Sequence, residues 1–156
     1  MTTYRLLLAA GLALAVLALS LRLLHGRAAP AVVADPLRTP GVLNPDVTQA
    51  TIAATICRRG WTRTIRPPTE YTDALKRRQL RQYGLAGPVS AYQEDHLISL
   101  ELGGHPTDPR NLWPEPYPRA ARVDVVENEL NARVCNGSLS LVGAQEQESA
   151  LKHSDG

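Results

Sequence analysis

A carboxylate and an imidazole stand side by side at Asp95 and His96. A carboxylate can hold a hard cation, and a neutral imidazole can take a proton from water near neutral pH. Adjacent side chains on a strand point to opposite faces, so this pair can serve one site only where the strand ends or bends. Gly103-Gly104 and the proline-rich loop that ends at Asn111 predict such a break. The pattern indicates metal-assisted hydrolysis.

At these residues the chain resembles the HNH nucleases of the ββα-metal (His-Me finger) superfamily. The shared features are Asp95-His96, the double glycine, Asn111-Leu112 at 15 residues from the histidine, and a helix-like stretch that follows. The resemblance implies that His96 is the general base, that Asp95 binds a divalent metal ion, and that Asn111 orients the histidine. The chain departs from the family pattern because it has no histidine between Asn111 and Asn136 and no zinc-binding cysteine pairs. The metal ligand on the helix therefore stays open.

The clearest helical pattern runs from Arg119 to Val134. At about 100° per residue, one apolar face is formed by Val123, Val126, Leu130 and Val134. The adjacent face carries Asp124, Glu127 and Asn128, whose oxygen atoms suit magnesium, calcium or manganese better than zinc. We favour Glu127 and Asn128 over Asp124 as the second metal ligand, because they lie deeper in the helix. The alternative is an ordinary polar helix face.

A basic segment precedes the acidic one. Its helical part is predicted from Thr69 to Tyr83, with Gly84 as the residue that ends the helix, and it carries Lys76, Arg77, Arg78 and Arg81. A basic half and an acidic half suit a polyanion on one side and a cation on the other, so these four residues are candidate nucleic-acid contacts. Contacts of this kind reach the phosphate backbone and carry no sequence information. Two ordinary solvated faces are the alternative.

The remaining elements complete an α+β prediction. We expect a helix from Asn44-Pro45 to about Cys57, a short strand over Trp61 to Arg66, and a strand-bend-strand segment over Val89 to Leu102. A final helix is expected from about Ser140 to Lys152. The predicted architecture is a small helical domain over residues 44–153 that surrounds a ββα-metal core, preceded by a linker over residues 32–43.

The first 31 residues have the composition of an export segment. Arg5 is followed by an uncharged apolar run from Leu6 to Leu21, and Ala29-Pro30-Ala31 offers a cleavage site for a signal peptide. An uncleaved single-pass membrane anchor is the alternative. Either of these places the domain outside the cytoplasm, in the periplasm, secreted or held at the membrane. An ordinary apolar helix without a role in export is the third alternative.

The chain has two cysteines, Cys57 and Cys135. In an exported chain an even number of cysteines predicts a disulfide bond, here one that closes a loop around the whole motif region. Two buried thiols are the alternative.

The resemblance implies a metal-dependent endonuclease that hydrolyses DNA first, with RNA also compatible, and the backbone contacts expected from the basic helix predict low sequence specificity. The metal implied by the resemblance and by the oxygen ligands is Mg²⁺ first, with Mn²⁺, Ca²⁺, Ni²⁺ or Zn²⁺ also compatible. The expected partner is nucleic acid, and a membrane tether accompanies it if the export segment is retained. The alternative is a non-catalytic domain of the cell envelope that binds a polyanion or is stabilised by a metal ion.

Overall fold

The computed structural model describes residues 32–154. The signal peptide or anchor expected at residues 1–31 lies outside this range. The described part is α+β, as predicted, with one pair of antiparallel strands and four α-helices. These are α2 (Trp61–Ile65), α3 (Thr69–Gln82), β1 (Tyr92–His96), β2 (Leu112–Pro116), α4 (Tyr117–Cys135) and α5 (Leu141–Lys152), with the 3-10 turns η1 (Ile52–Ala54), η2 (Val89–Ala91), η3 (Leu100–Leu102) and η4 (Pro109–Asn111). Within this range, no helix has the length and apolar character that crossing a membrane requires.

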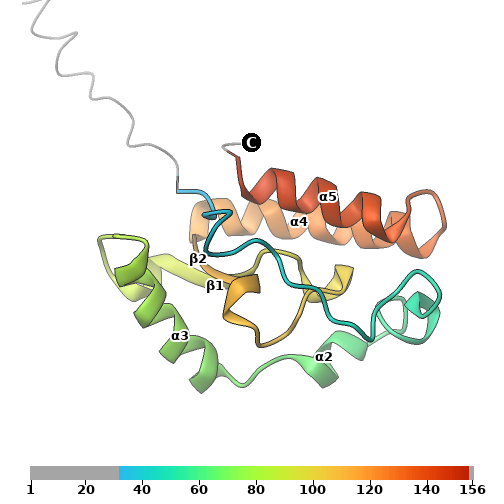
Figure 1. The fold of residues 1–156 in the computed structure, drawn as a ribbon, viewed down its shortest axis with the longest axis horizontal. Helices are drawn as coiled ribbons and strands as arrows, with labels where there is room; N and C mark the ends of the chain where they lie inside the picture. The colour runs from blue at the N-terminus through green and yellow to red at the C-terminus, as the bar shows by residue number, and fades with distance from the viewer. Residues whose placement is uncertain (1–31, 155–156) are drawn as a thin grey trace, which may run out of the picture. The chain divides into compact units, whose positions relative to one another are not determined.

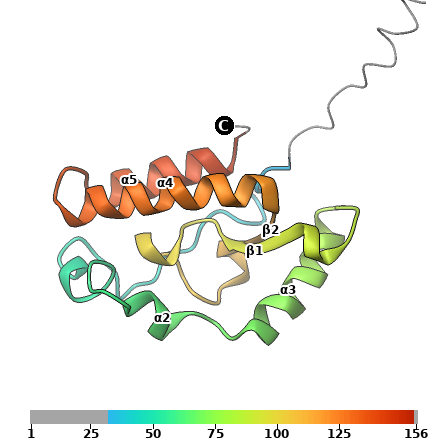
Figure 2. The same cartoon turned by 180° about the vertical axis from the view of Figure 1, so that it is seen from behind.

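The strands β1 and β2 form the centre of the fold. Their register runs from Tyr92 opposite Pro116 to His96 opposite Leu112, and a long loop over residues 97–111 joins them. Helix α4 follows β2 directly. The helices α4 and α5 lie side by side on one side of the strand pair, whereas α2 and α3 lie on the other (Figures 1 and 2). The strand pair thus lies between helices from distant parts of the chain.

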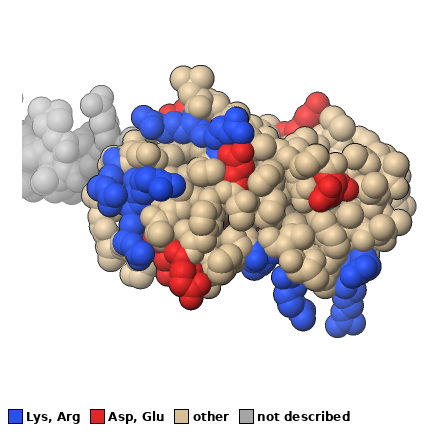
Figure 3. Space-filling view, turned by 60° about the horizontal axis from the view of Figure 1, so that its bottom comes forward, with Lys and Arg blue, Asp and Glu red and all other residues tan. Residues whose placement is uncertain are grey.

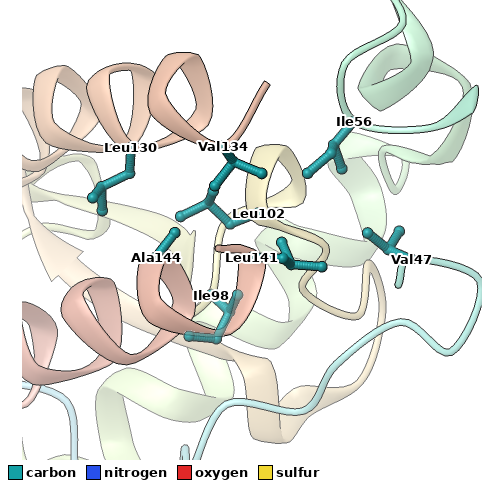
Figure 4. Packing of buried hydrophobic residues seen from close by; sticks show 8 residues of the cluster. All are labelled: Val47, Ile56, Ile98, Leu102, Leu130, Val134, Leu141 and Ala144. Atoms are coloured by element: carbon teal, nitrogen blue, oxygen red, sulfur yellow. The ribbon is translucent and has the colours of Figure 1, made fainter. Parts of the chain in front are cut away.

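The main hydrophobic core joins α4 and α5 to the loop between the strands and to the segment before α2 (Figure 4). It is formed by Val47, Ile56, Ile98, Leu102, Leu130, Val134, Leu141 and Ala144. A smaller core of Ala34, Leu97 and Trp113 lies at the strand pair. Burial of this apolar surface holds the loop over residues 97–111 against α4 and α5.

The disulfide bond between Cys57 and Cys135 is present, with the two Cα atoms 5.5 Å apart. It joins the segment before α2 to the last residue of α4, 78 positions further on. The predicted pairing is therefore confirmed.

Three predicted helices are confirmed. Helix α3 ends at Gln82, and Gly84 follows with a φ of +64°, a conformation that glycine adopts without steric cost. Helix α4, Tyr117–Cys135, begins two residues earlier and ends one residue later than predicted. Helix α5 begins after Ser140, whose hydroxyl accepts a hydrogen bond from the Gly143 N–H at 3.1 Å.

Two local predictions are wrong. The segment from Trp61 to Ile65 is helix α2 and not a strand, since Trp61 and Ile65 also lie one helical turn apart and Pro67 then holds Arg66 in an extended conformation. The segment after Asn44 forms turns instead of a long helix. There the Thr51 hydroxyl donates to the Asp46 carbonyl at 2.8 Å, and side-chain bonds of this kind compete with helix formation.

The expected strand-bend-strand segment also differs. Strand β1 ends at His96, and the apolar run that follows contains η3 instead of a second strand. The reason is that the Asn111 side chain occupies both backbone groups of Ile98, which would otherwise pair in a ladder. The second strand is β2, after the loop.

Candidate active site

A cavity of about 280 Å³ lies where β1, η3 and α4 meet. Its lining residues are Arg66, Gln93, Asp95, His96, Ser99, Leu100, Glu101, Asp124, Glu127 and Asn128. The fold thus brings the predicted pair Asp95-His96 together with all three candidate ligands on α4. Arg66, at the end of α2, adds a cationic side chain that the sequence analysis did not assign to the site.

His96 is the last residue of β1 and is buried. Its Nε2 atom lies 3.0 Å from the Pro106 carbonyl oxygen. Because a carbonyl oxygen can only accept a hydrogen bond, Nε2 carries the proton and Nδ1 keeps its lone pair. Burial lowers the pKa of His96, and the Pro106 contact and Asp95 oppose this shift only in part. The ring is therefore neutral at pH 7 and able to accept a proton.

Asn111 acts on the loop instead of directly on the imidazole. It is fully buried, and its side chain bonds the N–H and the carbonyl of Ile98 at 2.9 and 3.0 Å. A further hydrogen bond from Nδ2 reaches the His105 carbonyl at 3.0 Å. Pro106, the next residue, is the one that contacts His96. Asn111 therefore positions the histidine through the loop that carries Pro106.

The double glycine lets this loop close. Gly103 has a φ of +80°, in the left-handed region that favours glycine. A Cβ atom on Gly104 would lie 1.7 Å from the Ile98 carbonyl oxygen and 2.6 Å from Nδ2 of Asn111. Only a residue without a side chain allows the backbone to pass Asn111 at this distance.

A buried lysine on α5, Lys152, completes the site and was not recognised from the sequence. Its Nζ atom lies 2.8 Å from Oδ2 of Asp95 and 2.5 Å from Oε1 of Glu127. Oε1 of Glu148 is 3.3 Å away, and Nζ also donates to the His96 carbonyl. The sequence carried one sign of this cluster, since Glu148 and Lys152 lie one turn apart on the face of α5 that also presents Leu141 to the core.

Burial and the lysine set the charges in this cluster. Burial by itself would raise the pKa of Asp95, but the charge and hydrogen bond of Lys152, a hydrogen bond with Glu115 and the His96 ring together outweigh burial and lower this pKa. Burial raises the pKa of Glu127 to about 9, with Asp95 adding to the effect and Lys152 opposing it. Burial also raises the pKa of Glu148. The three carboxylates raise the pKa of Lys152 well above its ordinary value despite its burial. Lys152 and Asp95 are therefore charged at neutral pH, whereas Glu127, with a pKa of about 9, holds its proton.

This arrangement does not fit a divalent metal ion between Asp95 and Glu127. The ammonium group of Lys152 already lies between these two carboxylates. Across residues 32–154, no three or more His, Cys, Asp and Glu side chains are grouped as a metal site. Asp124 and Asn128 line the same cavity, and Nδ2 of Asn128 donates to the main-chain carbonyl of Asp124 at 2.7 Å.

The four basic residues predicted as nucleic-acid contacts separate into two groups. Arg77, Arg78 and Arg81 are exposed on α3. Lys76 instead has a side chain only 13% exposed, with Nζ 3.4 Å from Oδ1 of Asp73. Figure 3 shows Lys and Arg side chains in groups toward two ends of this face of the molecule. The three arginines are thus available to a polyanion, whereas Lys76 is occupied within the protein.

Comparisons of the chain with models of protein families, with curated proteins and with solved structures gave no match.

Proposed function

We propose that this protein is an endonuclease that hydrolyses phosphodiester bonds of DNA or RNA with low sequence specificity, outside the cytoplasm. One observation carries the proposal: His96, with Nε2 bonded to the Pro106 carbonyl, lines a cavity that Arg66 also lines. A neutral base and a guanidinium group in one cavity are suited to the hydrolysis of a phosphate ester. The order β1, loop, β2, α4 supports a ββα core of the HNH type.

The proposed reaction uses these two side chains. Nδ1 of His96 accepts a proton from water as the water oxygen attacks phosphorus. The bond from phosphorus to the leaving oxygen breaks, and the leaving oxygen takes up a proton from solvent water to leave as a hydroxyl group. The Arg66 guanidinium donates hydrogen bonds to the non-bridging phosphate oxygens and offsets the charge that develops there. The proposal contains no metal step, because Lys152 occupies the place between Asp95 and Glu127. The metal dependence implied by the HNH resemblance stays a prediction.

The surroundings of the cavity support a nucleic acid as substrate. Arg77, Arg78 and Arg81 on α3 present exposed positive charge, and arginines of this kind bind phosphates regardless of base sequence. The disulfide bond between Cys57 and Cys135 agrees with an oxidising compartment and thus with export.

A plasmid-nicking assay tests the proposal. The full-length protein, purified in a mild detergent, is incubated with supercoiled DNA in the presence of Mg²⁺, Mn²⁺, Ca²⁺, Ni²⁺ or Zn²⁺ and in a chelator. A positioned general base contributes about 10² to 10⁴ in rate, so His96→Ala should cleave at least about a hundredfold more slowly. His153→Ala, at the end of α5 and outside the cavity, serves as the control and should cleave like the wild type.

Two results would contradict the proposal. Equal cleavage by His96→Ala and wild type would remove His96 from the reaction. The second result is a wild-type protein that cleaves neither DNA nor RNA under any of these conditions but retards DNA in a mobility-shift assay. The protein would then be a non-catalytic domain that binds a polyanion.

A further inference from the structure

The Lys152 amine is held by groups from three separate elements. Asp95 Oδ2 comes from β1, Glu127 Oε1 from α4 and Glu148 Oε1 from α5, at 2.8, 2.5 and 3.3 Å from Nζ. The Lys152 side chain has no exposed surface. Two of the carboxylates, Asp95 and Glu127, also line the cavity with His96. The buried lysine therefore contacts two of the side chains that line the candidate catalytic cavity.

We propose that the Lys152 ammonium group is the resident cation of this site and excludes a divalent metal ion from the position between Asp95, Glu127 and Glu148. A divalent ion with oxygen ligands needs distances of about 2.0–2.6 Å to them. Nζ lies 2.5 and 2.8 Å from the Glu127 and Asp95 oxygen atoms that such an ion would bind, so the two cations cannot be present together. Their like charges would also repel strongly in a buried place.

The hydrogen bonds of the amine support this assignment. An ammonium group has three donors, and three acceptors are in place: Asp95, Glu127 and the His96 carbonyl. Glu148 contributes charge, and both of its oxygen atoms accept from the Ser99 N–H at 3.0 Å. The amine is thus fully satisfied where it lies. The amine of this one lysine lies among three carboxyl groups. If the amine were absent, these three groups would be available as ligands for a hard cation.

This assignment has a consequence for catalysis that rests on the proposed function. The positive charge next to Asp95 and His96 comes from the protein itself. Lys152 is a positioning residue in this scheme, because it holds Asp95 and the backbone of His96 and is closed off from the cavity.

Binding of Mn²⁺, read by electron paramagnetic resonance and calorimetry without nucleic acid, tests the assignment. The full-length wild type and Lys152→Arg, which keeps the charge, should bind no Mn²⁺ that depends on Asp95 or Glu127. Lys152→Met, which keeps the length and removes the charge, should bind one Mn²⁺ ion that Mg²⁺ or Ca²⁺ displaces. Adding Glu127→Gln to Lys152→Met should weaken that binding at least tenfold, whereas adding the exposed Glu146→Gln should not.

Two outcomes would overturn the assignment. One is a wild-type protein that binds a single Mn²⁺ ion and loses it in Asp95→Asn or Glu127→Gln. The other is a folded Lys152→Met variant that binds no Mn²⁺. If Lys152→Met does not fold without metal, its refolding on addition of Mn²⁺ supports the assignment. If it folds neither with nor without Mn²⁺, the measurement of Mn²⁺ binding to the wild type decides. Since no nucleic acid is present, a failure of the nuclease proposal leaves these results unaffected.

Discussion

Asn111 and Ile98 exchange two hydrogen bonds just beyond the end of β1. Oδ1 of Asn111 accepts from the Ile98 N–H at 2.9 Å, and Nδ2 donates to the Ile98 carbonyl at 3.0 Å. The side-chain amide thus mimics a neighbouring strand for one residue. Its third bond, to the His105 carbonyl, connects this point to the loop segment that holds the His96 ring.

Substitution of Asn111 by aspartate tests this connection. Asn111→Asp keeps the acceptor for Ile98 N–H but turns an oxygen atom toward the carbonyls of Ile98 and His105. Loss of buried donors should lower the free energy of unfolding by about 2–4 kcal/mol, measured by urea denaturation. Asn136→Ala, which removes one exposed side-chain bond to Ser138 N–H, is the control and should cost about 1 kcal/mol or less. Equal stability of Asn111→Asp and wild type would show that the amide donors are dispensable.

The periodic part of the fold could be predicted from the sequence, because helices repeat a local pattern. Val123, Leu130 and Val134 are buried as predicted, although Val126, assigned to the same face, is 36% exposed. The adjacent face with Asp124, Glu127 and Asn128 does line the cavity. In a segment of five residues such as α2, however, alternation and helical spacing cannot be told apart, and the strand prediction there was wrong.

The lysine cluster could not be predicted because its members are distant in sequence. Lys152 lies 57 residues from Asp95 and 25 from Glu127, and no local pattern connects them. A lysine near the end of a helix is usually solvated. Only the packing of α5 against α4 and the end of β1 shows that this one is buried. Arg66 was overlooked for a similar reason, since its place at the cavity depends on where α2 packs.

The disulfide bond should contribute a measurable part of the stability. It closes a loop between positions 78 apart, for which the chain-entropy model gives about 4 kcal/mol. Cys57→Ser combined with Cys135→Ser should therefore lower the urea midpoint strongly, and reduced wild type should behave like the double variant. The protein should be unfolded in denaturant without reductant and then treated with a thiol label. This labelling should find no free thiol. Two reactive thiols per chain in that assay would contradict the bond.

Glu94 is a buried carboxyl group without a hydrogen-bond partner for either oxygen atom among the described residues. Burial raises its pKa to about 8, and the nearby Lys76 opposes this shift only in part. In the unfolded chain the same group titrates near 4.5. Between these two pH values the native state binds more protons than the unfolded state, so the contribution of Glu94 to stability falls as the pH rises through this window.

Replacement of Glu94 by glutamine should remove this pH dependence. At pH 5 the variant and wild type should unfold at nearly the same urea concentration, because Glu94 is protonated in the native state. At pH 9 Glu94→Gln should be more stable, by up to on the order of 4 kcal/mol. Glu70→Gln, an exposed glutamate on α3, is the control and should change stability by less than about 0.5 kcal/mol at either pH. A difference between Glu94→Gln and wild type that does not grow with pH would refute the burial account.

Arg66 should matter more for cleavage than for binding. It lines the cavity, and its positive charge contributes to the lowered pKa of His96. Charge-assisted hydrogen bonds are worth about 1.5–3 kcal/mol, so Arg66→Ala should slow cleavage by roughly 10- to 100-fold. Arg63→Ala, on α2 just before Arg66 but outside the cavity lining, is the matched control and should cleave nearly as fast as wild type. Equal losses in the two variants would mean that Arg66 has no special contact with the phosphate.

The exposed arginines of α3 should govern the salt dependence of binding. Replacing Arg77, Arg78 and Arg81 together by alanine removes up to three phosphate contacts, and each contact contributes about 0.9 to the slope of log K against log salt concentration. The slope should therefore become shallower by about 2 to 3, measured by fluorescence anisotropy with a labelled duplex at several salt concentrations. Arg122→Ala, on the exposed side of α4, is the control and should leave the slope unchanged. If the triple variant keeps the wild-type slope, the polyanion binds on another surface.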